Sequence, residues 1–246
     1  MSIFLTLAFL FCVGAILGWG LEVLYRSLLS PKNPEHRWVN PGFCTGPWLP
    51  LYGSGLCILY LLAGLDRYDL TGILWTDRLL MLLAMLVCMT AIEYIAGLLC
   101  IKVAKVRLWD YSNNRGNIQG IICPVFSLIW GVLGAVYFFL VHPYIQDALG
   151  WLSQNLAFSF VIGLFYGVFL VDLIHSAQLV AKMKTFAEEH NVIVRYEDVK
   201  LHIRQFRERA GKRVWFIFAF YSDIPLAEHL KAAREAWEER KESRKK

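Results

Sequence analysis

Residues 79–102 read LLMLLAMLVCMTAIEYIAGLLCIK, and the only charged residue before the closing Lys102 is Glu93. About twenty predominantly apolar residues are enough to cross the hydrocarbon core of a bilayer as a helix. The stretch therefore predicts a transmembrane helix that carries one acid. It makes an all-α membrane protein the expected fold class.

The rest of the chain agrees with a membrane location. Hydrophobic residues make up 57% of the 246 residues, whereas soluble domains contain roughly 45–50%. Aromatic residues reach 15% and include nine Trp, a residue enriched at membrane–water interfaces. We therefore expect a polytopic protein with about five transmembrane helices, at residues 3–25, 47–64, 79–102, 119–141 and 155–181. Two prolines and two glycines interrupt the second span (Pro47, Pro50, Gly53 and Gly55).

The first span starts without a basic segment and shows no clear cleavage site, so we interpret it as a retained helix. The six cysteines form no CxxC pair, and four of them fall inside apolar runs. We expect neither a disulfide framework nor a metal site, and the sequence suggests no cofactor.

Lys and Arg in the short loops predict the orientation. They follow the predicted first, third and fifth spans, whereas residues 142–154 contain none. This alternation predicts a multi-pass protein of the cytoplasmic (inner) membrane, with the N-terminus outside and the C-terminus in the cytoplasm. The basic residues are Arg26, Lys32, Arg37, Lys102, Lys105, Arg107, Arg115, Lys182 and Lys184.

A change in composition divides the chain into a transmembrane domain, 1–182, and a charged, helical cytoplasmic tail, 183–246. Within the tail, VWFIFAFYS (214–222) is too short to cross the membrane as a helix, so we expect it at the interface. The last segment predicts a helix that begins near Pro225, with Glu and Lys/Arg spaced for i,i+4 pairs. Either a solvated helix or a docking site for a partner fits this pattern.

Two segments of the membrane domain share a weak sequence similarity. It suggests either a parallel repeat of helix pairs or a chance likeness of two interfacial loops. In each copy an acid on the outgoing helix precedes a loop with Trp, Asn, Gly and Pro, and the Pro lies seven residues after the Asn. The two sets are Glu22, Trp38, Asn40, Gly42, Pro47 and Glu93, Trp109, Asn117, Gly120, Pro124. In parallel-repeat transporters the binding site lies at the repeat interface.

Four ionisable side chains fall within the predicted spans: Glu22, Glu93, Asp172 and His175. Such groups are expensive in a bilayer and normally face the bundle interior. Glu22 is near a helix end and can reach headgroup water, whereas Glu93 is deeper. Asp172 and His175 share one helix face. They could form a satisfied polar pair, a proton relay or half of a metal site.

The two loops, 38–55 and 109–124, combine Gly, Pro, Asn and aromatic residues, with Asp110 added in the second. They suggest either tightly folded loops over a polar cavity or plain interfacial turns. GxxxxGK[ST] is absent, so the chain itself does not look like an ATPase. No catalytic residue is predicted. The candidates for substrate binding or proton handling are Glu22, Asn40, Gly42, Pro47, Glu93, Trp109, Asp110, Asn117, Gly120, Asp172 and His175.

At these loops the chain resembles a bacterial family of small membrane proteins labelled "putative ABC-transporter permease", the CmpB-like type IV group, and the related animal transmembrane-229 proteins. The matching stretches are GWGLEVLYR (18–26), VNPGFCTGPWLPLYGSG (39–55), IEYIAGLL (92–99) and WDYSNNRGNIQGIICP (109–124). The family pattern has an Arg where this chain has Pro41, and another Arg after the glycine at position 120. The resemblance covers about residues 14–182 and implies a transport component.

Three functions fit these features, and whether the protein is an enzyme stays open. The first is a permease-like transport component with a path lined by Glu93, Asp172 and His175, assisted by a second copy or a separate ATPase subunit. The second is an enzyme acting on a lipid or lipid-linked substrate, with Glu22, Glu93 and His175 as acid/base groups and Asn40 and Asn117 as amide donors. The third is a non-catalytic scaffold whose tail recruits a partner. Membrane lipids are expected partners, and nucleic acid is not.

Overall fold

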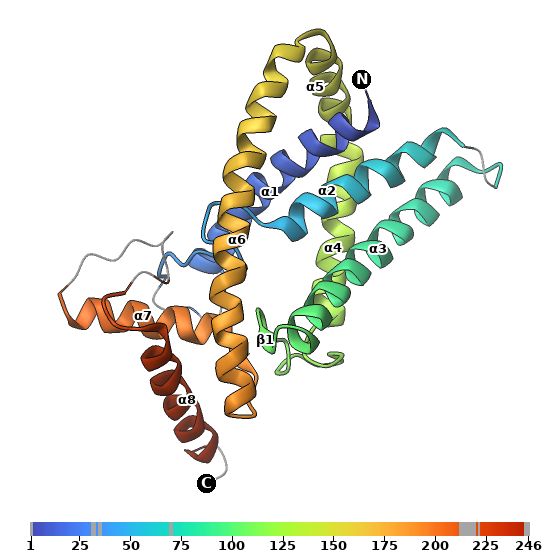
Figure 1. Ribbon diagram of the computed structural model, residues 1–246. Coiled ribbons are helices and arrows are strands. Elements are labelled where there is room, and N and C mark those ends of the chain that lie inside the picture. Colours follow the sequence, from blue (N-terminus) through green and yellow to red (C-terminus); the bar gives the residue numbers. More distant parts are fainter. Residues whose placement is uncertain are drawn as a thin grey trace. The chain divides into compact units, whose positions relative to one another are not determined.

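The computed structural model describes residues 2–30, 33, 36–68, 71–211, 220 and 222–243, and it confirms the all-α fold class (Figure 1). The long helices are α1 (Ile3–Leu28), α3 (Leu74–Lys102) and α6 (Ser159–Glu189). The shorter helices are α2 (Pro50–Ala63), α4 (Pro124–Val136), α5 (His142–Gln154), α7 (Tyr196–Arg209) and α8 (Leu226–Ser243). The strands β1 (Val106–Arg107) and β2 (Val194–Arg195) form a short parallel ladder.

Within the described residues, four helical segments are long and apolar enough to cross a membrane: Ile3–Leu28, Leu74–Lys102, Pro124–Gln154 and Leu156–Glu189. The predicted second span is the shorter apolar helix α2, which continues into the 3₁₀ helix Gly64–Arg67. Together these two helices rise about 29 Å, close to the ~30 Å hydrocarbon core. The protein is therefore a polytopic membrane protein, and a fifth span through α2 stays a prediction.

Residues 142–154, expected as a loop after the fourth span, form helix α5. A five-residue π-helix, Tyr137–Val141, joins α4 to α5, and Pro143 lies at the start of α5. Proline lacks the N–H that a continuing helix needs and clashes with the preceding turn. The wider π turn just before Pro143 lets the helical path continue to Gln154 instead of ending.

The described chain divides into two compact units. Unit 1 comprises 1–20, 48–96 and 110–170, and unit 2 comprises 21–47, 97–109 and 171–246. The expected domain division at residue 183 stays a prediction.

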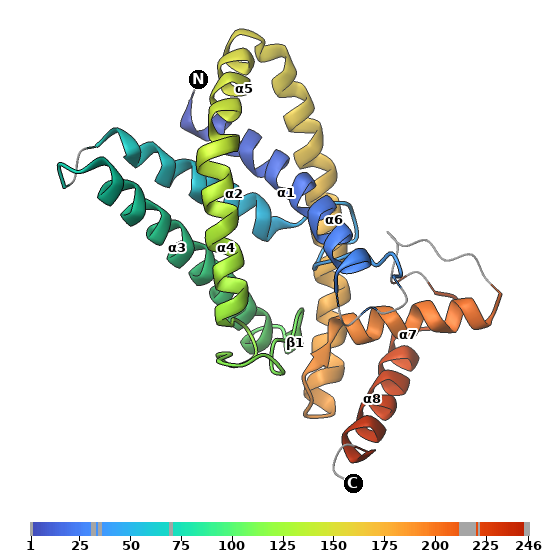
Figure 2. The same ribbon diagram turned by 180° about the vertical axis from the view of Figure 1, so that it is seen from behind.

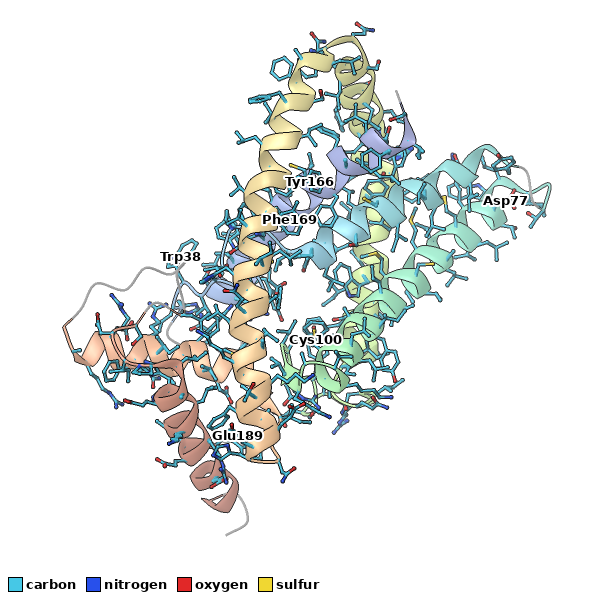
Figure 3. The ribbon with its side chains drawn as sticks, in the orientation of Figure 1. Trp38, Asp77, Cys100, Tyr166, Phe169 and Glu189 are labelled. Atoms are coloured by element: carbon cyan, nitrogen blue, oxygen red, sulfur yellow. The ribbon has the colours of Figure 1, made fainter. Side chains whose placement is uncertain are left out.

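Unit 1 has a core of aliphatic, Met and aromatic side chains from α1–α5, including Leu10, Met85 and Trp130. Helices α1 and α2 come close together because glycine lies at the contact: a Cβ at Gly53 would be 2.7 Å from the carbonyl oxygen of Phe11. The ring of Phe11 packs against the α6 residues Tyr166 and Phe169, which Figure 3 labels.

Unit 2 has a separate core around β1, the end of α6, α7 and α8, with Met183, Tyr196 and Ile203 fully buried. Helices α7 and α8 pack against each other, as both views show (Figures 1 and 2). The last helix begins at Leu226, directly after Pro225, which agrees with the prediction. The apolar segment 214–222 lies largely outside the described residues, as does Lys32.

Candidate functional site

Glu93 is a buried acid on α3 with two hydrogen-bond donors in unit 1. Its side chain is 3% exposed. The indole Nε1 of Trp130, on α4, donates to Oε2 at 2.9 Å. The hydroxyl of Tyr111 donates to Oε1 at 3.1 Å. The three residues are called the Glu93 site below, and each carboxylate oxygen in it has a donor.

The two donors of the Glu93 site differ chemically. An indole N–H can only donate, whereas a tyrosine hydroxyl can donate or accept. If Glu93 takes up a proton on Oε1, Tyr111 can turn its hydroxyl to accept that proton, and Trp130 keeps its bond to Oε2. Ring packing holds both donors. The ring centroids of Tyr111 and Phe126 are 4.3 Å apart and stacked, and those of Trp130 and Tyr52 are 5.2 Å apart. The arrangement can therefore hold Glu93 with or without a proton.

The second loop, residues 110–123, is folded by hydrogen bonds within itself, from its backbone and from its side chains. The amide of Asn117 donates to the carbonyls of Ser112 and Asn114, and its oxygen accepts the backbone N–H of Gly120 at 2.9 Å. Asp110 accepts from the backbone and hydroxyl of Ser112. Gly120 has φ 68°, a conformation that glycine adopts without strain. These candidates thus give the loop, and Tyr111 within it, a fixed shape.

The first loop, residues 38–47, belongs to unit 2, and α6 binds its last residues. Asp172 accepts the backbone N–H of Gly46 at 3.1 Å. Ser176, one turn further along α6, accepts the N–H of Thr45 at 3.2 Å. Asn40 is 1% exposed and donates its amide to the carbonyl of Thr45 at 2.7 Å. Both Asn40 and Asn117 therefore use their amide N–H groups inside their own loops.

Two residues of α7 that the sequence analysis did not select bind the other end of the first loop. The Lys200 Nζ lies 2.9 Å from the carbonyl oxygens of both Asn40 and Gly42. The Tyr196 hydroxyl donates to the carbonyl of Phe43 at 2.8 Å. A signal was present, since an aromatic and a basic residue four positions apart share one helix face.

Burial shifts two titrations at the first loop. It raises the pKa of the Cys44 thiol to about 12, and the nearby Asp172 carboxylate adds to that shift. Cys44 is therefore a protonated thiol near neutral pH and a poor nucleophile. Burial, together with a smaller contribution from the charge of Arg26, lowers the pKa of Lys200 to about 7.

The remaining candidates play smaller parts. Glu22 forms an i,i+4 ion pair with Arg26 at 2.8 Å and is half-buried. The surroundings of Glu22 therefore differ from those of Glu93. His175 is exposed, and neither a hydrogen bond nor an ion pair joins it to Asp172. Pro47 and Trp109 are half-buried. Among the described residues, no three His, Cys, Asp or Glu side chains gather closely enough to hold a metal ion.

The described helices and the buried polar site define the class: an all-α, polytopic membrane protein with an acid inside a helix that is long and apolar enough to cross a membrane. The chain belongs to the family described as "Putative ABC-transporter type IV", whose sequence profile matches residues 9–177. The match contains the Glu93 site, both loops and Asp172, and it ends before α7. No curated protein and no solved structure matches the chain significantly.

Proposed function

We propose that the protein is a permease-like transport component of the bacterial inner membrane, and that Glu93 is the proton-handling acid of its polar site. The observation that carries the proposal is the placement of Glu93. A carboxyl group lies inside a membrane-crossing helix, 3% exposed, between a donor that cannot accept and a hydroxyl that can. An ionisable group in such a place is costly, and in membrane proteins it commonly serves transport or proton transfer.

Family membership supports the same class of function. An ABC-transporter permease works with an ATPase, and the chain has no phosphate-binding consensus of its own. We therefore propose a separate ATPase subunit, or a second copy of the chain, as partner, because so few helices enclose little volume alone. The basic loops support an orientation with the N-terminus outside and the C-terminus in the cytoplasm.

The decisive variant is Glu93→Gln, because its shape is close to that of protonated Glu93. The glutamine oxygen can accept from Trp130, and its NH₂ group can donate to Tyr111, so the fold is retained while the titration is lost. Glu22→Gln is the matched control, since it removes an acid from α1 whose partner is the neighbouring Arg26.

The experiment compares metabolites inside cells and in the medium for a deletion strain carrying wild type, Glu93→Gln or Glu22→Gln. We expect Glu93→Gln to reproduce the deletion profile and Glu22→Gln to match wild type. Equal profiles for Glu93→Gln and wild type, alongside a distinct deletion profile, would contradict the proposal. Native mass spectrometry of the gently extracted protein would identify the ATPase or the second copy.

A further inference from the structure

Helix α7 lies along the first loop through a row of residues spaced four apart. From the N-terminal end these are Tyr196, Lys200, Arg204 and Glu208. Their partners run the opposite way along the chain: Phe43, then Gly42 and Asn40, then Trp38, then Arg37. Residues at i and i+4 lie on one helix face. One face of α7 therefore contacts the segment 37–43 along its length, at five of its residues.

The bonds in this row are of one kind over most of its length. Side-chain donors of Tyr196, Lys200 and Arg204 bind the backbone carbonyls of Phe43, Gly42, Asn40 and Trp38. At the far end, Arg37 forms an ion pair with Glu208 at 2.7 Å. The N–H groups of Thr45 and Gly46 go instead to α6. Helix α7 thus binds carbonyl groups in the first part of the loop, whereas α6 binds the amide groups of Thr45 and Gly46 near its end.

The Lys200 contact is suited to an uncharged amine. Its Nζ reaches two carbonyl oxygens, the residue as a whole is 4% exposed, and no carboxylate pairs with it among the described residues. An ammonium group has three N–H donors, whereas a neutral amine has two, which is the number of carbonyl acceptors here. Burying a charge without a counter-ion is costly.

Charged and titratable groups surround Lys200 on several elements. On α1, Arg26 opposes its charge, and that guanidinium itself pairs with Glu22 and with Glu197 of α7. In the first loop, the Cys44 thiol interacts with both Lys200 and Asp172 of α6. The Tyr196 ring of α7 lies 4.8 Å from Nζ, and the Phe220 ring, beyond the end of α7, lies 5.6 Å from it. Both rings favour the charged amine, but the loss of solvation on burial has the larger effect and lowers the pKa of Lys200.

We propose that α7 is a releasable strap on the first loop, and that proton uptake by Lys200 loosens it. The residues of the strap lie beyond the part of the chain that matches the family profile, whereas the loop lies within it. In this arrangement the C-terminal region regulates a loop of the membrane domain. The proposal does not depend on transport or on Glu93.

The direction of the pH effect follows from linkage. The pKa of Lys200 falls from its ordinary 10.5 to about 7 when the strap is docked. Between those pH values the released strap carries a proton that the docked strap lacks. Docking is therefore strongest at high pH, and it weakens as the pH falls towards 7.

The test is hydrogen–deuterium exchange of residues 38–47 in the full chain, held in lipid nanodiscs and corrected for intrinsic exchange rates. In Lys200→Met, which keeps the length of the side chain but cannot donate, we expect at least about tenfold faster exchange of the Thr45 and Gly46 amides. Wild-type protection should fall between about pH 9 and about pH 7, and the variant should lose this dependence. Gln205→Ala, an exposed position on α7 outside the row, should behave as wild type.

Faster exchange throughout the chain would mean that Lys200→Met does not fold, and Tyr196→Phe then decides. That variant removes only the hydroxyl that binds Phe43 and leaves the ring in place. We expect severalfold faster exchange confined to 38–47, with the wild-type pH dependence retained. Wild-type exchange in folded Lys200→Met or in Tyr196→Phe, or greater wild-type protection at about pH 7 than at about pH 9, would overturn the proposal.

Discussion

The two acid-and-loop segments share residue types but differ in how they are held. Glu93 is buried, and two uncharged groups donate to it, whereas Glu22 is half-buried and paired with Arg26. The second loop is bonded within itself by the Asn117 amide and by backbone pairs such as the Tyr111 N–H to the Gly120 carbonyl, whereas side chains of α6 and α7 hold the first loop. Similar sequence elements thus produce a buried acid in one segment and a docking surface for a helix in the other.

The largest expected difference is in stability after loss of the acid. Glu93→Ala leaves the Trp130 N–H and the Tyr111 hydroxyl without their acceptor, at about 1–3 kcal/mol for each buried group. Glu22→Ala breaks a partly exposed i,i+4 pair, so we expect less than about 1 kcal/mol. Unfolding in mixed micelles measures both values, and Glu93→Gln should recover most of the loss. Equal losses for the two alanine variants would remove the distinction between the segments.

A second comparison uses a glycine from the helix that follows each loop. A Cβ at Gly53 would lie 2.7 Å from the backbone oxygen of Phe11, which cannot move without the helix. A Cβ at Gly131 would meet the end of the Leu86 side chain at 2.9 Å, and that side chain can rotate. We expect Gly53→Ala to cost about 1–3 kcal/mol and Gly131→Ala less. Thermal unfolding in detergent measures the stability of both variants. A larger loss for Gly131→Ala than for Gly53→Ala would contradict the close approach of α1 and α2.

The second loop should depend on one amide. Asn117→Ala removes three hydrogen bonds inside that loop, so exchange of residues 110–123 should become faster by about tenfold or more. Asn114→Ala is the milder comparison, because it removes a weak hydrogen bond from the Asn114 amide to the Cys123 sulfur. Hydrogen–deuterium exchange measures both, and unchanged exchange in Asn117→Ala would mean that other contacts fold the loop.

The smallest effect is expected at the exposed end of the strap. The Arg204 and Arg37 guanidinium groups hold the pKa of Glu208 below its ordinary value. A carboxylate of this kind stabilises docking above its ordinary pKa, and the contribution disappears as the pH falls through the lowered value. Glu208→Gln should therefore weaken first-loop protection less than threefold at neutral pH and in a salt-dependent way. An effect as large as that of Lys200→Met would mean that Glu208 contributes as much to the docking of α7 as Lys200 does.

The sequence predicted the apolar helices well because each is long and its hydrophobic residues are nearly continuous. It placed the helix start near Pro225 and identified Glu93 as the deep acid. It failed at 142–154, which lies between two predicted spans and was expected to be a loop, because a local π turn is not visible as a pattern.

The site partners were harder to predict than the acid. Trp130 and Tyr111 are 37 and 18 residues from Glu93, and aromatic residues near a membrane have common interfacial uses. Asp172 and His175 do share a face, yet only the packing shows that Ser176, not His175, joins Asp172 at the first loop. The proposed repeat also places Pro47 opposite Pro124, whereas α2 begins at Pro50 and α4 begins at Pro124.

Infrared difference spectroscopy of the purified protein in nanodiscs, between about pH 9 and about pH 5, tests most directly whether Glu93 binds a proton. A protonated carboxyl group gives a carbonyl band that an ionised one lacks. The account predicts one such band that survives Glu22→Gln, disappears in Glu93→Gln and shifts in Tyr111→Phe, where the switching hydroxyl is lost. A spectrum that is unchanged by Glu93→Gln would contradict it.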